Sequence, residues 1–455
     1  MASITSLGIG SGLDLNGLLG QLQQAERAKL EPIEQQRQEQ QVQISAYGET
    51  QGALSGFESA ANRLNDPSLF EGRNAEVTGS AVQAAADNEA APGEYGVTVD
   101  QLAAAGSLAT QRVDDPSAEI SSGATDLDLT FEDAALNTTV NIAADSTLED
   151  IRDAVNADPE AAVSASVIND GEGYRLALMS EETGEQASIT GTNFDAVADQ
   201  ATLSDATVTQ AGQDANLEVN GIAITSTTNQ VEGAIQGVTL DLQQQGSSTV
   251  TVTRDDDSIH EAVTDFVDAY NELRDTTGRL TAFNGAEGEP GALIGDSAVR
   301  MLESSLRSDL AAGVSVDGEQ HLLSDMGLSL AVDGTLNLDA EQLDTALADD
   351  PDSVAGFFTG DSEEGGLAGR LSVTAGQLLD QNGALERSIS GAENRIDSLN
   401  DRYELTEQRI EQTIDRYRTQ FGQLDSMMAE MNQTSAFLTQ QLSQLGGSAG
   451  GDSMG

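Results

Sequence analysis

Apolar residues near the C-terminal end recur in alternating steps of three and four residues, and this repeat strongly constrains the fold. The alternation runs from Ile389 to Ile410, is interrupted by a second consecutive four-residue step to Ile414, and then resumes as far as Leu445. Such a repeat predicts a long helix whose apolar seam packs against other helices, with local unwinding of the supercoil at the interruption. The seam residues that form a candidate interface are Ile396, Leu399, Tyr403, Ile410, Tyr417, Phe421, Leu424, Met428 and Met431.

Arginines recur every seven residues beside this seam. Charged residues at such flanking positions usually set the partner and the orientation of a coiled coil. The natural counterparts are acidic residues in the N-terminal part of the chain, namely Glu26, Glu31, Glu34 and Glu39. The candidate interface therefore also includes Arg395, Arg402, Arg409 and Arg416.

The N-terminal end is also helical in pattern. Leu15, Leu18 and Leu22 recur at helical steps and complete the candidate interface. A Gln-rich run at 34–43 interrupts the pattern, and Pro32 is expected to kink or restart the helix there. The two ends are predicted to pair, and periodicity leaves open whether they pair within one chain or between subunits.

Residues 74–257 read mostly as β-strands. Asn220-Gly221, between alternating flanks, is the strongest hairpin signal. One helix is expected after Ser146, which should cap it together with Glu149. Strands at 162–168 and 174–179 follow, which predicts a strand-helix-strand-strand unit.

Helical patterns return from Ser258, with Asp333-Gly334 marking a hairpin among them. Strand-rich sequence thus stands between two helical ends. The expected fold class is multidomain α+β, with the sheet-rich part inserted between terminal helices that pair with each other.

The charge balance excludes several classes of function. The 455 residues include 77 acidic and 20 basic ones, among them a single lysine, Lys29, for a formal net charge of -57. Such a surface repels phosphate backbones and anionic membranes, so neither nucleic acid binding nor membrane insertion is expected, and it predicts a halophilic source. Without cysteine there are no disulfides or thiolate metal sites, and the glycine-broken N-terminus predicts no cleaved signal peptide.

Little in the sequence indicates catalysis. His260 and His321 stand without a recognisable nucleophile, and the glycines at 8–12 do not follow a strand. The acidic clusters at 255–257 and 349–352 lack the spacing of a calcium loop, and the first is expected to cap the next helix. We therefore expect no enzyme, no cofactor and no metal site.

Four segments, which together cover nearly the whole chain, match a known pattern. They are Ser6-Leu-Gly-Ile-Gly-Ser-Gly-Leu-Asp-Leu with Ala25-Glu-Arg; the unit at 139–189, with Thr147-Leu-Glu-Asp-Ile-Arg-Asp-Ala-Val-Asn; Asp214-Ala-Asn-Leu-Glu-Val-Asn-Gly-Ile with Phe266-Val-Asp-Ala-Tyr-Asn-Glu-Leu; and Arg416-Tyr with Phe421-Gly-Gln-Leu-Asp-Ser-Met-Met. In these segments the chain resembles the flagellar filament cap family, also called hook-associated protein 2. The second segment alone is similar to the flagellin hook insertion motif.

The resemblance implies a non-enzymatic cap at the distal tip of the flagellar filament. Such a cap promotes folding and polymerisation of exported flagellin and prevents its loss. The implied partners are copies of the chain itself in a ring-like homo-oligomer, a pentamer or a nearby stoichiometry, together with flagellin, the hook-filament junction protein and a type III export chaperone. The implied location is extracellular, at the flagellum tip, reached by the flagellar type III route.

The resemblance also implies a coiled-coil leg of terminal helices, a helix-rich domain and two inserted β-rich head domains. The corresponding ranges are 1–45 for the N-terminal export and leg helix, 46–73 and 258–388 for the helix-rich domain, 74–107 and 206–257 for the inner head domain, 108–205 for the outer head domain, and 389–455 for the C-terminal leg helix and tail.

Three alternatives stay open: a hook-filament junction protein, a flagellin and an extracellular adhesin. A junction protein requires a different N-terminal opening. Cell adhesion through anionic glycans requires a basic head, whereas residues 74–257 carry only four basic residues, Arg112, Arg152, Arg175 and Arg254.

Overall fold

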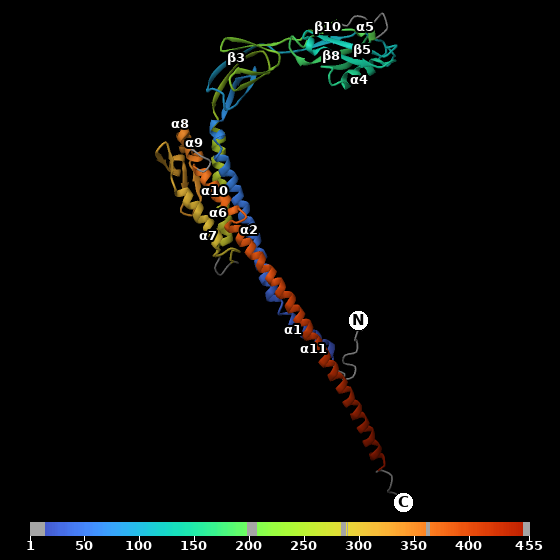
Figure 1. The fold of residues 1–455 in the computed structure, drawn as a ribbon, viewed down its shortest axis with the longest axis vertical. Coiled ribbons are helices and arrows are strands. Elements are labelled where there is room, and N and C mark those ends of the chain that lie inside the picture. The colour runs from blue at the N-terminus through green and yellow to red at the C-terminus, as the bar shows by residue number, and fades with distance from the viewer. Residues whose placement is uncertain (1–13, 198–206, 284–287, 289, 361–364, 449–455) are drawn as a thin grey trace. The chain divides into compact units, whose positions relative to one another are not determined.

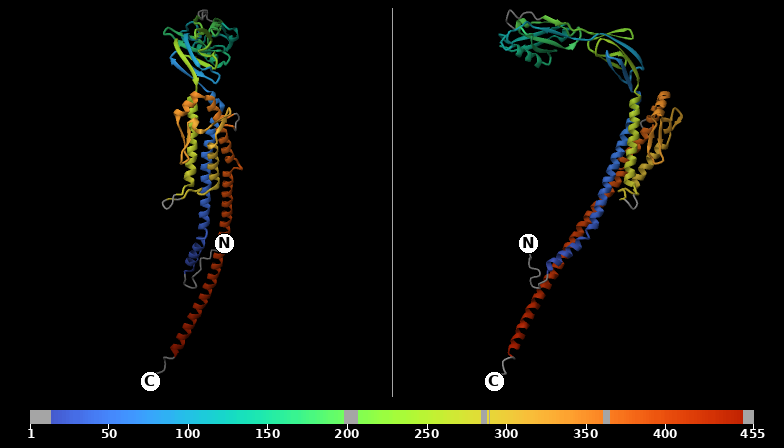
Figure 2. Two further views of the ribbon diagram at one scale, coloured as in Figure 1. Left: turned by 90° about the vertical axis from the view of Figure 1, so that its left-hand side faces the viewer. Right: turned by 180° about the vertical axis from the view of Figure 1, so that it is seen from behind.

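The computed structural model describes residues 14–197, 207–283, 288, 290–360 and 365–448, and it divides into two compact units. One unit contains both ends of the chain, Met1–Asp66 and His260–Gly455, and the other contains Pro67–Ile259 between them. Figure 1 and Figure 2 show the elements of each. The expected α+β class, with sheet-rich sequence inserted between helical ends, is confirmed.

The unit that contains the chain ends is mainly helical. Helix α2 lies side by side with α11, and α10 packs against α2 and α7 (Figure 2). Its helices are α1 (Leu15–Arg27), α2 (Glu31–Leu64), α6 (Asp256–Thr281, which starts at the end of the other unit), α7 (Ser297–Ala311), η2 (Leu323–Met326), α8 (Ala340–Asp349), α9 (Pro351–Thr359), α10 (Leu367–Leu379) and α11 (Ala384–Ser448). Two hairpins accompany them, β16 (Val314–Val316) with β17 (Glu319–His321), and β18 (Leu328–Leu330) with β19 (Leu336–Leu338).

Helix α2 shows how local sequence sets an element. Pro32 lies in its first turn, where a missing N–H costs nothing, so the proline restarts the helix after α1. The Gln-rich run continues the same helix, which extends over 34 residues. Phe57 is fully buried near its C-terminal end, 5.3 Å from Phe266 and 5.8 Å from Tyr270 between ring centroids. This aromatic cluster joins α2 to α6.

The hairpin predicted at Asp333-Gly334 exists, but its loop is longer than a two-residue turn. The last paired residues are Leu330 and Leu336, and Gly334 has φ 88° inside the loop between them. Asn271 on α6 accepts a hydrogen bond from the N–H of Leu336 at 2.8 Å and donates to its C=O at 2.9 Å. The loop end is therefore anchored to the helical core.

The other unit contains two clusters of strands, each with its own buried core. In the inner head domain a five-stranded sheet, ordered β1-β15-β3-β11-β12, shares an apolar core with a three-stranded sheet, ordered β13-β14-β2. These elements follow helix α3 (Pro67–Glu71). The strands are β1 (Arg73–Gly79), β2 (Val82–Ala86), β3 (Gly93–Gln101), β11 (Ala215–Val219), β12 (Ile222–Ser226), β13 (Gln230–Ile235), β14 (Val238–Leu242) and β15 (Gly246–Arg254).

The outer head domain packs a four-stranded sheet, ordered β10-β4-β8-β7, and a three-stranded sheet, ordered β6-β5-β9, around a second core. Its elements are β4 (Ala105–Ala109), β5 (Thr125–Phe131), η1 (Ala134–Leu136), β6 (Thr138–Ile142), α4 (Leu148–Ala157), β7 (Val163–Asn169), β8 (Tyr174–Thr183), β9 (Ile189–Thr192), α5 (Phe194–Val197) and β10 (Thr207–Gln210). The order β6, α4, β7, β8 is the predicted strand-helix-strand-strand unit. Because β10 pairs with β4, the four-stranded sheet extends past both expected boundaries of 108–205.

The turn at Asn220-Gly221 is a two-residue hairpin, as predicted. Val219 pairs directly with Ile222, and the two residues between them have φ values of 50° and 80°. Positive φ at both central positions is typical of a type I′ turn, for which Asn-Gly is the preferred sequence.

The cap of α4 lies one residue later than predicted. Thr147, not Ser146, is the N-cap: its hydroxyl accepts a hydrogen bond from the N–H of Asp150 at 3.1 Å, and the Asp150 carboxylate accepts one from the N–H of Thr147 at 2.9 Å. Hydrogen bonds from the Thr147 backbone and side chain lower the pKa of Asp150. The Ser146 hydroxyl instead donates to the C=O of Ala143. The expected pair of Ser146 and Glu149 was therefore wrong.

We expect Thr147→Ala to destabilise α4 by about 1 kcal/mol, because the substitution removes an N-cap acceptor. Hydrogen exchange at the α4 amides should become roughly fivefold faster. Thr147→Ser is the matched control, since it keeps the hydroxyl. Equal exchange in all three proteins would show that the capping box does not stabilise this helix.

Candidate assembly interface

The terminal helices form the leg, in which α1 and α2 pack against α11. A small buried cluster lies in its middle, where Leu19 and Leu30 meet Ile410 and Ile414. Half-buried aromatic residues surround the cluster, namely Tyr403, Tyr417 and Phe421. The predicted pairing of the two ends therefore occurs within one chain.

Helix α1 contacts α11 through a face slightly different from the predicted one. Leu15 is buried and Leu22 is half-buried, but Leu18 is 48% exposed and Leu19 is buried in its place. Steps of four and three residues, from Leu15 through Leu19 to Leu22, keep these side chains on one face of the helix. Leu18 therefore does not contribute to the seam within the chain.

The residues of the seam predicted on α11 become more exposed toward the C-terminal end of the helix. Leu399 and Ile410 are buried, and Ile396, Tyr403, Tyr417, Phe421 and Met428 are half-buried. Leu424 and Met431 are exposed, the latter to 58%. The structure therefore brings together only the part of the seam that faces α1 and α2.

The arginines predicted to flank the seam do not pair with the acidic residues proposed for them. Arg395, Arg402, Arg409 and Arg416 are exposed, and within the described residues no ion pair joins any of them to the N-terminal helices. A cation–π contact occurs in this part of the leg instead: the Arg37 guanidinium on α2 lies 5.9 Å from the centroid of the Tyr403 ring on α11. Partial burial and a hydrogen bond with Glu34 raise the pKa of Tyr403.

The interruption in the apolar repeat coincides with the break between α1 and α2. The chain turns at Ala28–Leu30, and Leu30 packs against Ile410 and Ile414, which are the end of the double four-residue step. A polar groove of about 380 Å³ runs beside this contact, lined by residues that include Arg27, Leu30 and Ile414. The double four-residue step in α11 thus accommodates the turn between α1 and α2.

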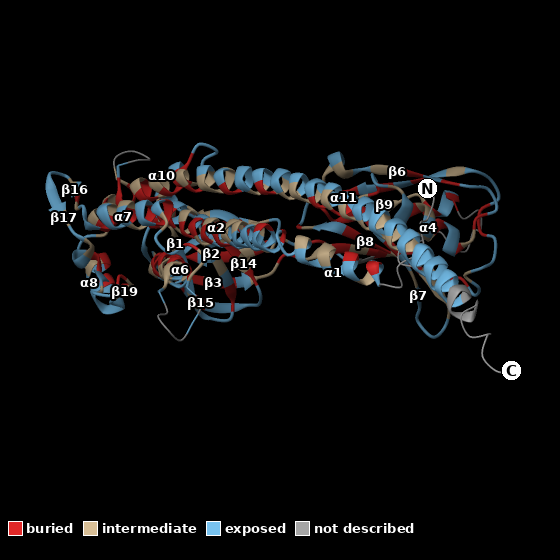
Figure 3. Cartoon of the chain, turned by 90° about the horizontal axis from the view of Figure 1, so that it is seen from below, coloured by how far each residue is buried: buried red, intermediate tan, exposed pale blue. Residues whose placement is uncertain are grey.

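Beyond the start of α1, helix α11 continues without a partner helix in the described part of the chain. Every side chain from Met431 to Ser443 is exposed, as the pale blue of this end of α11 in Figure 3 shows, and Figure 1 shows α11 continuing past α1. It nevertheless carries large apolar residues, among them Met427, Met431, Phe437, Leu438 and Leu442. Exposed apolar residues on one helix mark a surface for association. Leu445 lies outside the residues whose side chains are described.

One partly buried hydrogen bond joins α2 to the start of α7. The Tyr47 hydroxyl on α2 donates to the Asp296 carboxylate at 2.6 Å. Asp296 is also the N-cap of α7 and accepts hydrogen bonds from the N–H groups of Ala298 and Val299. Burial and the hydrogen bond to Asp296 raise the pKa of Tyr47 to about 12. The residues lie 249 positions apart, so no local pattern could have revealed the pair.

We expect Tyr47→Phe to lower the free energy of unfolding by about 1 kcal/mol, because the partly buried Asp296 carboxylate loses one of its three donors. The wild-type contribution should be constant below about pH 10, the value for an unfolded tyrosine, and should be lost as the pH rises to about 12, because the folded phenol has the higher pKa. Urea unfolding at several pH values measures this.

Tyr95→Phe is the control, since it removes a hydroxyl whose hydrogen bond, to the C=O of Ala91 in the other unit, is exposed. A stability difference between wild type and Tyr47→Phe that stays constant from pH 8 to 12 would contradict the assignment.

The described residues give His260 and the first acidic cluster structural contacts. No three His, Asp or Glu side chains among them are arranged to hold a metal ion. His260 hydrogen-bonds the Asp344 carboxylate at 2.5 Å, which links α6 to α8. Asp255 accepts a hydrogen bond from the N–H of Ser258 and so caps α6, as expected for the 255–257 cluster. Among the described helices, none has both the length and the apolar composition needed to cross a membrane.

These features define a class of protein: a multidomain α+β assembly protein with a coiled-coil leg, a helix-rich domain and two inserted β-rich head domains. The model for the flagellar hook-associated protein 2 N-terminus matches residues 11–106, and the model for its C-terminus matches residues 212–433. The flagellin hook IN motif matches residues 128–182. The opening at 6–13, one of the segments that carry the resemblance, lies outside the described residues.

Full-length relatives agree with these matches. The chain is 34% identical to flagellar hook-associated protein 2 of Escherichia coli K12, over 97% of this chain and 98% of the relative. It is 32% identical to the Salmonella typhimurium protein of the same name, over 98% and 99% of the two chains. The crystal structure of the D1-D2-D3 domains of the flagellar cap protein FliD from Escherichia coli matches with a TM-score of 0.64 and 32% identity, over 76% of this chain and 99% of that one. The chain belongs to the flagellar hook-associated protein 2 family.

Proposed function

We propose that this protein is a non-enzymatic cap at the distal end of a flagellar filament. There it promotes the folding and polymerisation of exported flagellin and prevents its loss. The observation that carries the proposal is the leg, whose longer helix ends in exposed apolar residues that have no partner within the described chain. The family supports the same role, since a solved relative is a flagellar cap protein.

The assembled state is a ring-like homo-oligomer, a pentamer or a nearby stoichiometry. The exposed arginines of the leg, together with Leu18, Leu424 and Met431, face outward and are available to a neighbouring subunit or to the filament. The further partners are flagellin, the hook-filament junction protein and an export chaperone. The chain reaches the flagellum tip through the flagellar type III route.

Complementation tests this function. The gene is expressed in the native host after deletion of its own copy, and flagellin in the culture fluid and filament length are measured. A cap reduces free flagellin and restores long filaments. Undiminished leakage would overturn the proposal. Restoration only in a strain that lacks a junction protein would favour that alternative.

A further inference from the structure

Strand β12 forms one edge of the five-stranded sheet and pairs with β11 alone in the described structure. Its register is regular from Val219↔Ile222 to Ala215↔Ser226, without a bulge. A two-residue turn makes Val219 and Ile222 a hydrogen-bonded pair, and the pattern then alternates along the ladder. The backbone N–H and C=O groups of Ala223 and Thr225 therefore point away from β11.

Three other strands, β7, β19 and β13, have edges that are protected in part. Asn156 on α4 accepts a hydrogen bond from the N–H of Ala165 on β7 at 2.7 Å and donates to its C=O at 2.9 Å, so its amide occupies the outward backbone groups. Asn271 does the same at Leu336 on β19. Strand β13 is interrupted by a register shift after the charged residue Glu232. Such devices prevent unwanted strand pairing.

Strand β12 has none of these protections. The thirteen residues from Val219 to Val231 contain no charged side chain, in a chain with a net charge of -57. Ile222 is 69% exposed although it lies on the same face as the buried Val219, and Ile224 on that face is half-buried. The apolar face of the sheet therefore continues to β12 without full cover.

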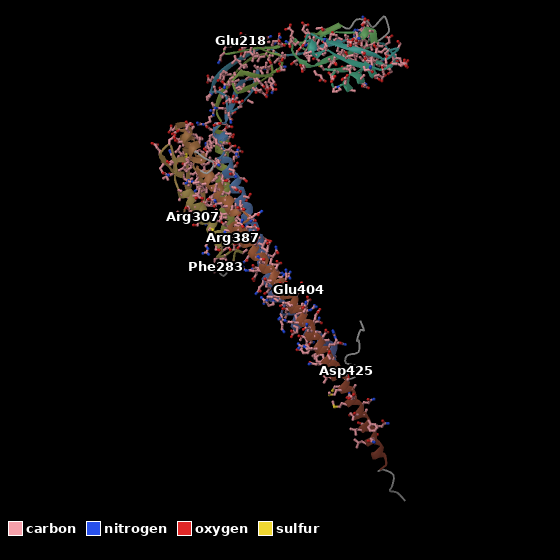
Figure 4. All side chains as sticks on the ribbon, viewed as in Figure 1. Glu218, Phe283, Arg307, Arg387, Glu404 and Asp425 are labelled. Atoms are coloured by element: carbon pink, nitrogen blue, oxygen red, sulfur yellow. The ribbon has the colours of Figure 1, made fainter. Side chains whose placement is uncertain are left out.

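We propose that the edge of β12 binds an extended segment of flagellin that has not yet folded, by accepting it as an additional strand. This inference rests on the proposed function and names how the cap holds its client. Backbone hydrogen bonds at Ala223 and Thr225 would bind many sequences, and apolar side chains at alternate positions of the segment would cover Ile222. Glu218, which pairs with Ala223 and is labelled in Figure 4, disfavours an acidic segment.

The short length of the edge favours a transient client over a second copy of this chain. Only two residues present outward backbone groups, so the contact gains few hydrogen bonds and its lifetime is short. A newly exported subunit must be released after it folds. A permanent subunit contact in a ring needs a larger surface.

Ala223→Pro tests the proposal. It removes an outward N–H donor but no bond of the β11 ladder, and proline is tolerated at such positions of edge strands. Ala223→Val is the matched control, because it keeps the donor. Binding of the full chain is measured by fluorescence anisotropy with a short labelled peptide of alternating valine and threonine that ends in arginine, and unfolded flagellin serves as competitor.

We expect Ala223→Pro to weaken peptide binding about tenfold, Ala223→Val to leave it unchanged, and unfolded flagellin to compete. Ile222→Lys, which leaves the ladder intact and adds a charge to the edge, should also weaken binding, and this variant decides the question if the proline variant fails to fold by circular dichroism. Equal binding of the peptide by the wild type, Ala223→Pro and Ile222→Lys would overturn the proposal. The proposal would also be overturned if Ala223→Pro changed the size of the oligomer and the wild-type chain did not bind the peptide. That result would assign the edge of β12 to contact between copies of this chain.

The complementation assay separates this result from the function itself. If the wild-type chain retains flagellin at the filament but does not bind the peptide or unfolded flagellin, the strand-edge inference is wrong and the capping function stands. If the wild-type chain does not retain flagellin, the capping function fails, whatever the peptide shows.

Discussion

Deletion of residues 425–455 is expected to abolish filament capping while the sheet-rich unit stays folded. The deletion removes the end of α11 that has no partner helix, together with Met427, Met431, Leu438 and Leu442. It leaves the buried cluster around Ile410 and Ile414, and both head-domain cores lie in Pro67–Ile259. Cells that produce the truncated chain should release as much flagellin as cells that lack the gene. Retention of flagellin at the filament should therefore fall at least about tenfold, which for a binding equilibrium corresponds to about 1.4 kcal/mol.

A full-length variant separates loss of the apolar surface from loss of length. Replacing Met427, Met431, Phe437, Leu438 and Leu442 with glutamine keeps a good helix former at each position and removes the apolar side chains. The same capping defect is expected. Circular dichroism should show unchanged strand content in both proteins, and a truncated chain that restored full-length filaments would show that this end of α11 is not the docking surface.

The helical repeat of the leg could be predicted from sequence because it depends on local spacing. A repeat defines which face of a helix is apolar, but it does not define where the partner ends. Leu424 and Met431 continue the pattern of Leu399 and Ile410, yet both are exposed, and every described side chain of α11 from Met431 onward is exposed. The repeat therefore defines one face of α11, and only part of that face is covered within the chain.

Charge pairing was harder to predict than apolar pairing. Arg395 and its three counterparts have the spacing of a coiled coil, yet in the described leg Glu34 contacts Tyr403, and Glu26 pairs with Lys29 in the turn that follows α1. A surface ion pair is worth about 1 kcal/mol or less, so packing around Leu30 decides how the helices align. The arginines are left exposed at the surface of the leg.

Competing local signals explain the error at α4. Ser146 with Glu149 and Thr147 with Asp150 both fit the spacing of a capping box. The Ser146 backbone N–H is bound to the hydroxyl of Ser121, 25 residues away, and this tertiary contact starts the helix one residue later. The tie between Tyr47 and Asp296 depends in the same way on contacts that sequence spacing does not report.

Thermal stability is expected to rise steeply with salt, by on the order of 10 °C in the midpoint of unfolding between 0.05 and 0.5 M NaCl. The chain carries 77 acidic residues against 20 basic ones, so most carboxylates have no cation nearby and repel one another in the compact state. The screening length falls from about 10 Å at 0.1 M to about 3 Å at 1 M, which removes most of this repulsion. The same expectation carries the proposal of a halophilic source.

The form of the salt dependence distinguishes screening from a general effect of salt on apolar groups. Screening saturates once the Debye length is shorter than the spacing of surface charges, whereas strengthening of apolar contacts continues with concentration. The rise should therefore flatten above about 0.5 M NaCl. Replacing the exposed neighbours Glu181 and Glu182 with glutamine should raise the midpoint at low salt and leave it unchanged at high salt. A midpoint that increases linearly to 2 M, or one that the double substitution does not shift, would rule out carboxylate repulsion as the main cause and with it the argument for salt adaptation.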